Sequence, residues 1–187
     1  VIDAQRRWIW TLGTKRRGRK IDDLLIAFDR KGRIRKEISL MDLLEPQRII
    51  YPAAPGLWNQ FYEGDLIDWG HANSLSFDTT GRRALISLRH QDAVIELNVE
   101  TEQLLWILAS EKGWSKSRQS LLLKPVGDTQ LPHRQHSAQW ASNGGLLLFD
   151  NGRSQSRVVN YLVDLSKRTV EQTWTPIESR VDLGPVL

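Results

Sequence analysis

Short apolar runs separated by glycine-containing turns dominate the chain. They follow one another at the spacing of strands, and no long segment shows the 3.6-residue period of an amphipathic helix. The pattern therefore predicts an all-β protein, with one short helix expected between residues 41 and 50. The clearest strand candidates are 8–10, 24–28, 84–88, 93–97, 103–106, 146–149, 158–163 and 169–174.

Two stretches share the same order of features. The sequence reads D-W-G-H-A-N-S-L-S-F-D around His71 and H-R-Q-H-S-A-Q-W-A-S-N-G-G around His136. After each histidine a glycine turn leads into an apolar run that ends at polar residues, and a later strand closes with Trp106 or Trp174. Repeated units that each bring a polar residue to one point are typical of β-propellers. We therefore expect His71 and His136 to converge.

The two histidines lie 65 residues apart, which is long for a blade of four short strands, so we infer insertions. The chain should hold about three blades, whereas a closed propeller needs at least four. We expect a piece of a larger propeller that is poorly soluble or a homo-oligomer by itself, because open edge strands pair with other chains. The predicted partial propeller domain, 1–187, divides into an incomplete blade (1–64, with an irregular insertion at 41–65), a blade (66–107), an insertion (108–133), a blade (134–174) and a tail (175–187).

The net charge of +4 is unevenly distributed, since residues 1–37 carry twelve lysines and arginines against five acids. The cluster at 15–20 could bind nucleic acid, but no aromatic residues interleave it as base stacking would require. We interpret it as a solvated hairpin tip and expect no nucleic-acid partner. No apolar run is long enough to span a membrane, so no membrane partner is expected either. Disulfides and thiolate metal sites are excluded because the chain has no cysteine.

The candidate chemistry lies in histidine and arginine side chains. The spacings of the four histidines match no helical zinc signature, so we expect neither a metal nor a cofactor. Arg89 closes the unit that His71 opens, and two imidazoles with a guanidinium suit a tetrahedral oxyanion. Asn73 adds an amide donor, and an unprotonated histidine nitrogen can act as a nucleophile. This set predicts phosphoryl or sulfuryl transfer. The histidines are His71, His90, His133 and His136.

Five motifs in order resemble those of the bacterial aryl-sulfate sulfotransferases. They are the string around His71, I-S-L-R-H-Q, W-I-L-A-S-E-K-G-W-S-K, L-L-L-K-P-V, and Q-H-S-A-Q-W with L-L-L-F-D-N-G. The resemblance covers residues 65–174. It implies a six-bladed β-propeller with its site on the axis, a bacterial periplasmic location, and transfer of a sulfuryl group from a phenolic sulfate donor to a phenol acceptor without a nucleotide donor.

The resemblance also implies roles for individual residues. His136 matches the histidine that takes the sulfuryl group covalently as a sulfohistidine, His71 a histidine that binds the sulfate, and Asn73 its neighbouring amide. Arg89 matches the arginine that neutralises the transferring oxygens. The family uses a further histidine on an earlier blade, and residues 1–64 contain none. We therefore expect the chain alone, as the middle of the enzyme, to be inactive.

Several residues keep two interpretations. Trp69 is either a packing aromatic or part of a phenol pocket, His90 either a structural residue or a substrate contact, and Asn151 either a turn residue or a substrate contact. His133 is interpreted as a loop residue. For the whole chain, a non-catalytic propeller module that binds a protein or an anionic ligand is the alternative of another class. Such a scaffold has no need of His136, and nucleic-acid binding through 15–20 is a third alternative.

Overall fold

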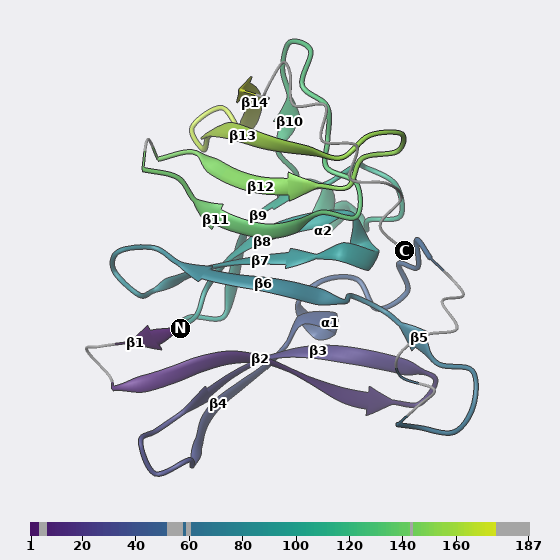
Figure 1. Ribbon diagram of the computed structural model, residues 1–187, viewed down its shortest axis with the longest axis vertical. Coiled ribbons are helices and arrows are strands. Elements are labelled where there is room, and N and C mark those ends of the chain that lie inside the picture. Colours follow the sequence, from purple (N-terminus) through teal and green to yellow (C-terminus); the bar gives the residue numbers. More distant parts are fainter. Residues whose placement is uncertain (4–6, 52–57, 59–60, 143, 175–187) are drawn as a thin grey trace.

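The structure is a computed structural model that describes residues 1–3, 7–51, 58, 61–142 and 144–174, so the predicted tail 175–187 lies outside the described residues. Three sheets lie one above another in Figure 1, which confirms the all-β class. The α-helices of the described part have one turn each, α1 (Leu40–Leu43) and α2 (Lys116–Gln119), so α1 falls at the start of the expected helical segment. No helix in this part of the chain is long and apolar enough to cross a membrane.

The first sheet is built around a long hairpin. Its path runs β1 (Ile2–Asp3), β2 (Trp8–Arg17), β3 (Lys20–Phe28) and β4 (Ile34–Ser39), with neighbours antiparallel. The two-residue strand β5 (Ile67–Asp68) pairs with β3 in parallel. The sequence did not predict β5, because so short a strand has no hydrophobic period of its own.

The basic cluster 15–20 forms the tip of the β2–β3 hairpin, as interpreted from the sequence. Several of its charges have partners. Arg17 Nη1 lies 2.7 Å from an Asp42 carboxylate oxygen and 3.2 Å from one of Asp22. Lys15 Nζ lies 3.8 Å from a Glu37 carboxylate oxygen. The tip is therefore partly neutralised within its own sheet.

The second and third sheets follow the repeated order of features. The second contains β6 (Ala72–Phe77), β7 (Arg83–Leu88), β8 (Ala93–Asn98) and β9 (Gln103–Leu108), all antiparallel. The third contains β11 (His136–Trp140), β12 (Leu146–Asp150), β13 (Arg157–Asp164) and β14 (Thr169–Trp174), also antiparallel. One strand from the segment interpreted as an insertion, β10 (Lys124–Pro125), joins the third sheet beside β14 in parallel.

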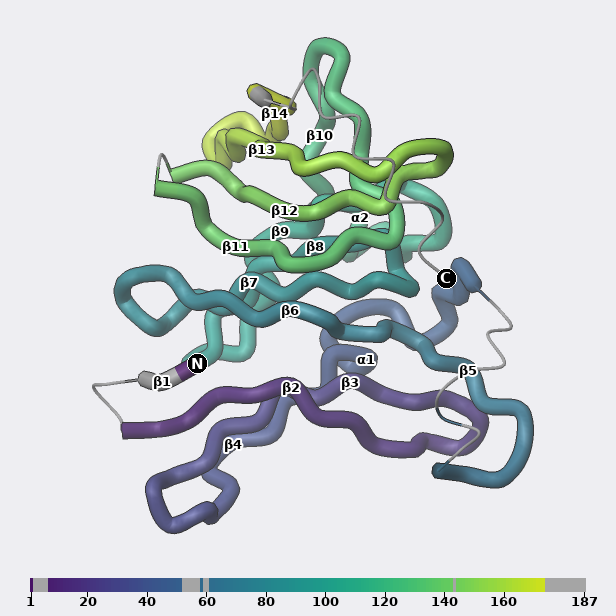
Figure 2. Tube along the Cα trace, in the orientation of Figure 1, coloured from purple at the N-terminus to yellow at the C-terminus, as the bar shows by residue number. Residues whose placement is uncertain are grey.

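The second sheet is apolar on both faces because it lies between the other two (Figure 2). On β7, Ala84, Ile86 and Leu88 pack into the core shared with the first sheet. Leu85 on the same strand packs into the core shared with the third sheet. A strand buried on both faces reads as a mostly apolar run rather than an alternating one, as 84–88 does with Ser87 as its one polar residue. Each buried leucine or isoleucine of this kind contributes roughly 1.5–3 kcal/mol on burial.

The motif F-D-x-x-G-R forms the same turn twice. In the first copy Asp29 Oδ1 accepts hydrogen bonds from the backbone N–H groups of Lys31 and Arg33. In the second copy Asp78 Oδ1 accepts from the N–H groups of Arg82 and Arg83. The glycine of each copy has a positive φ, 75° at Gly32 and 68° at Gly81, which a residue with a Cβ adopts at a cost. The motif thus encodes the capped turn that joins β3 to β4 and β6 to β7.

A buried carboxyl group connects the first sheet to the start of β6. Asp23 on β3 is 3% exposed, and its Oδ1 accepts a hydrogen bond of 3.0 Å from the N–H of Ala72. Gly70 leaves room for this carboxyl group, because a Cβ at that position would overlap Asp23 Oδ2. Burial raises the pKa of Asp23 to about 7.

Replacement of Asp23 by asparagine should change the pH dependence of stability. A raised folded-state pKa means that the stabilising contribution of protonated Asp23 is complete near its unfolded value of 3.8 and is lost as pH rises through about 7. Asparagine keeps the oxygen that accepts from Ala72 and carries no charge. Thermal unfolding should be measured at a series of pH values. Between pH 3.8 and about 7, the unfolding temperature of the wild type should fall relative to that of Asp23→Asn. If the unfolding temperatures of the two proteins changed with pH in the same way, the raised pKa of Asp23 would be contradicted.

Candidate active site

Two neighbouring strands of different sheets begin at the same place. Strands β6 and β11 lie side by side and start at the same end of their sheets (Figure 1). His71 immediately precedes β6, and His136 is the first residue of β11. Both strands have a register irregularity just inside this end, after Ala72 and after His136. Bulges re-aim side chains next to active sites, so the irregularity repeats where the candidate residues lie.

The amide of Asn73 contacts the ring of His136. Asn73 Nδ2 donates to the main-chain oxygen of Gln135 at 2.9 Å and lies 3.0 Å from His136 Nδ1. An amide nitrogen can only donate, so His136 Nδ1 accepts and the neutral ring carries its proton on Nε2. Burial, followed by the neighbouring Arg89 and His71, lowers the pKa of His136. The uncharged ring, which a nucleophile requires, is therefore favoured.

The start of β11 is fastened to the second sheet by Gln135. Its fully buried side chain donates to Ser87 Oγ at 3.0 Å and to the main-chain oxygen of Ala93 at 2.8 Å. Ser74 Oγ accepts from the N–H of Ala138 at 2.9 Å. These bonds fix His136 relative to β6. Sequence reasoning assigned no role to Gln135, although its position directly before His136 in Q-H-S-A was a usable signal.

His71 reaches the site through an unusual backbone conformation. Its φ is +52°, in the left-handed region, and it lies outside the regular strand. His71 therefore does not share a regular strand face with Asn73, which lies at the irregularity of β6.

Asp68 holds the His71 ring. Its carboxylate Oδ2 lies 2.6 Å from His71 Nδ1, and only 7% of its side chain is exposed. Burial opposes ionisation, but the hydrogen bond from His71 and the nearby His90 keep the pKa of Asp68 below its ordinary value. A carboxylate only accepts, so His71 Nδ1 donates and Nε2 is the ring nitrogen available to a ligand. The spacing D-W-G-H was the signal for this pair, and sequence reasoning did not use it.

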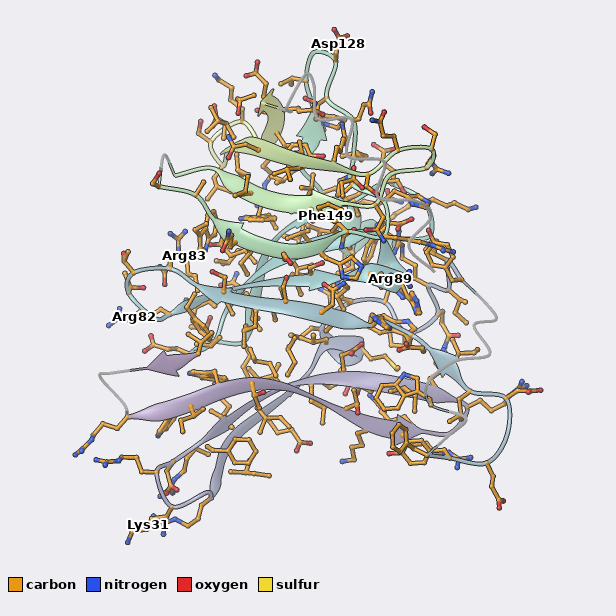
Figure 3. All side chains as sticks on the ribbon, in the orientation of Figure 1. Lys31, Arg82, Arg83, Arg89, Asp128 and Phe149 are labelled. Atoms are coloured by element: carbon orange, nitrogen blue, oxygen red, sulfur yellow. The ribbon has the colours of Figure 1, made fainter. Side chains whose placement is uncertain are left out.

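Arg89 and His90 form the first two residues of a 3₁₀ turn that ends at Gln91. The N–H of Arg89 donates to the main-chain oxygen of His71 at 3.2 Å, which brings the turn next to the start of β6. Successive strand residues face opposite sides, but the turn places these two side chains in contact, with 2.9 Å between Arg89 Nη1 and His90 Nε2. Figure 3 shows Arg89 at the opposite end of the second sheet from Arg82 and Arg83.

A second cluster, Tyr51, Asp92, His133 and Arg134, adjoins this group. The Tyr51 hydroxyl donates to Asp92 Oδ2 at 2.8 Å and lies 3.1 Å from His133 Nε2. The Arg134 guanidinium lies 4.3 Å from the centre of the Tyr51 ring. Burial, then the charge of Arg134, lowers the pKa of Arg89, so two guanidinium groups act on the same small region. Such a region attracts anions.

The remaining candidates, Trp69 and Asn151, make contacts of another kind. Trp69 is 1% exposed and packs in the core between the first and second sheets. Its ring therefore lies beneath the surface of the site. Asn151 follows β12, and its main-chain oxygen accepts from Ser156 Oγ at 3.3 Å. Among the described residues, no hydrogen bond joins Asn151 to His136 or Arg89.

One group of described residues, Asp68, His71 and His90, could supply three metal ligands. The distance of 2.6 Å between Asp68 Oδ2 and His71 Nδ1 is a hydrogen-bond distance. Two ligands around a tetrahedral zinc ion at about 2.0–2.1 Å lie roughly 3.3 Å apart. These side chains are therefore placed to bond one another rather than a metal.

The fold is all-β, and the starts of β6 and β11 gather histidine and arginine side chains into a candidate site. Residues 9–180 match the family described as Arylsulfotransferase (ASST), and the chain belongs to this family. It is 34% identical to the arylsulfate sulfotransferase AssT of Escherichia coli O6:H1 (strain CFT073), over 57% of this chain and 22% of the relative. It is 29% identical to the AssT of Lelliottia amnigena over the same shares, 57% and 22%. The chain thus spans about a fifth of the length of the curated relatives it matches.

Proposed function

We propose that the protein transfers a sulfuryl group from a phenolic sulfate ester to a phenol and that His136 carries the group between them. The meeting of His71, Asn73, Arg89 and His136 at the start of two neighbouring strands is the observation that carries this proposal. These are the residues that the family motifs single out. The names of both relatives support an aryl sulfate as the donor.

In the first step a lone pair of neutral His136 attacks the sulfur. The bond between sulfur and the phenolic oxygen breaks and its electron pair leaves with that oxygen, so that the phenolate takes a proton from solvent and leaves as the free phenol. Arg89 and His71 stabilise negative charge on the sulfuryl oxygens, which is most effective in a site shielded from water. In the second step an acceptor phenol gives up its proton, attacks the sulfohistidine and restores His136.

The resting position of Asn73 sets a condition on this step. Attack through Nε2 of His136 requires the ring proton to move to Nδ1, and attack through Nδ1 requires the lone pair that Asn73 now contacts. In either case the Asn73 contact with Nδ1 changes during the reaction. Asn73 therefore holds the resting tautomer, and its contact with Nδ1 must change before His136 can attack.

We also propose that the three sheets are consecutive blades of a β-propeller and that the protein acts in the bacterial periplasm. The family resemblance implies both. Three antiparallel sheets in succession along the chain, with two of them starting beside each other at the site, support the first.

Steady-state kinetics of the intact gene product test the function. With 4-nitrophenyl sulfate as donor and a second phenol as acceptor, release of 4-nitrophenol should follow a ping-pong pattern. Protein mixed with the donor alone should carry a sulfuryl group on the peptide that contains His136, detected by mass spectrometry. A sequential kinetic pattern would contradict the covalent intermediate, and no turnover of any aryl sulfate would contradict the function.

A further inference from the structure

The ring of His90 is constrained at both nitrogens. Nδ1 lies 2.7 Å from the main-chain oxygen of Asp68, and Nε2 lies 2.9 Å from Nη1 of Arg89. A carbonyl oxygen only accepts and a guanidinium only donates. Nδ1 must therefore carry a proton, and Nε2 must be bare. The neutral Nδ1–H tautomer is the one form of the ring that meets both demands.

The surroundings of His90 favour this uncharged form. The residue is 6% exposed and its ring packs against the ring of His71, with 4.6 Å between centroids, and against that of Tyr51 at 5.8 Å. The Asp68 carboxylate lies 3.7 Å from Nδ1. Burial lowers the pKa of His90, and although Asp68 raises it, the charges of His71 and Arg89 add to the lowering. The ring is thus fixed in orientation and protonation together.

Arg89 has no carboxylate partner among the ion pairs of the described residues, so its position needs another explanation. A neutral acceptor can hold a guanidinium without cancelling its charge. A carboxylate in the place of His90 would hold it too, but would compete with a bound anion for the same charge. A histidine locked in its neutral form combines a fixed guanidinium with an undiminished positive charge.

We propose that His90 is a positioning residue that holds the Arg89 guanidinium toward the transferring group through its unprotonated Nε2. The main-chain oxygen of Asp68 holds the His90 ring in place through Nδ1. The proposal rests on the proposed function and assigns His90 a role other than substrate contact, because both of its ring nitrogens are already occupied. Asp68 becomes the common support of the site. Its carboxylate holds His71, and its main-chain oxygen holds His90.

Two substitutions separate the two bonds of His90. In His90→Gln the side-chain oxygen can occupy the place of Nε2 and accept from Arg89. In His90→Asn the amide nitrogen can occupy the place of Nδ1 and donate to Asp68, but nothing reaches Arg89. We expect kcat for 4-nitrophenyl sulfate to fall about 10- to 100-fold in His90→Asn, the effect of losing one hydrogen bond to a charged group. His90→Gln should retain most of the wild-type kcat, and KM should change little in either variant.

Thermal unfolding of both variants separates positioning from folding. Equal losses of kcat in the two variants, or losses that follow their unfolding temperatures, would overturn the proposal. A second control uses the Arg89→Ala background, where His90→Asn should cause no further loss because its effect passes through the missing guanidinium. Fully additive losses would also overturn the proposal.

Nitrogen NMR of the histidine-labelled intact protein tests the tautomer without any assay of turnover. The His90 ring should show a protonated Nδ1 and an unprotonated Nε2, and the opposite tautomer would overturn the proposal. The two failures are distinguishable. A protein with the expected tautomer and no turnover contradicts the proposed function, whereas turnover with equivalent Gln and Asn variants contradicts the role of His90.

Discussion

Alanine in place of His136 is expected to abolish turnover of 4-nitrophenyl sulfate, with a loss on the order of 10⁶ in kcat as for removal of other enzymatic nucleophiles. In the proposed mechanism the other groups of the site bind and stabilise the sulfuryl oxygens, and His136 alone carries the sulfuryl group. The fold should persist, because the side chain is only half-buried and the start of β11 is fastened by Gln135. Release of 4-nitrophenol measures the loss.

Gln139 offers a matched control on the same strand. It is exposed on β11, so Gln139→Ala should leave both turnover and unfolding temperature close to those of the wild type. Intact activity in His136→Ala would remove the nucleophile assignment. A comparable loss in Gln139→Ala would show that β11 as a whole, rather than the imidazole, is needed.

Alanine in place of Arg89 should lower kcat by about 10²–10³-fold, the effect of losing one charge-stabilising donor in other enzymes. The guanidinium acts on charge that the sulfuryl oxygens carry in the transition state, so kcat should change more than KM. Arg89→Lys should recover only part of the rate, because an ammonium lacks the planar fork of donors with which a guanidinium can bond His90 and an anion together.

Arg82 is the control for charge alone. It lies in the turn at the other end of the second sheet (Figure 3), and its ion pair with Glu100, at 3.6 Å, is exposed. Exposed pairs of this kind contribute little to stability, so Arg82→Ala should be close to wild type in rate and unfolding. A loss on Arg82→Ala equal to that on Arg89→Ala would mean that net charge, and not the placed guanidinium, determines the rate.

The sequence predicted the fold where local pattern decides it. The strands appear where apolar runs are bounded by glycine, and the turns at Asp29 and Asp78 follow from a short motif whose side chain caps its own backbone. The sequence did not predict β5 or β10, because two-residue strands exist only through partners far along the chain. Trp69 packs in the core, which is one of the two interpretations that the sequence left open, because packing between sheets depends on tertiary contacts.

The candidate site also has a part that the sequence predicted and a part that it did not. The repeated setting of His71 and His136, and the place of Arg89 at the end of a run, were visible in the sequence. The supports of these residues were not. Whether Asp68 meets His71 depends on a left-handed turn, and whether Arg89 meets His90 depends on a 3₁₀ turn in place of a strand end. Tyr51 and Arg134 come together from distant segments, so no spacing indicates their contact.

The left-handed backbone at His71 has an evolutionary consequence. A residue other than glycine costs about 1–2 kcal/mol in this conformation, so selection for stability alone would favour glycine there. Yet His71 also satisfies the buried Asp68 carboxylate, and a change at either position alone leaves the other without its partner. In a lineage released from selection for activity, positions 68 and 71 should therefore drift as a pair, with glycine entering at 71 only once the acid has gone. Where activity is still under selection, Asp68 and His71 should both persist, although glycine at position 71 would be more stable.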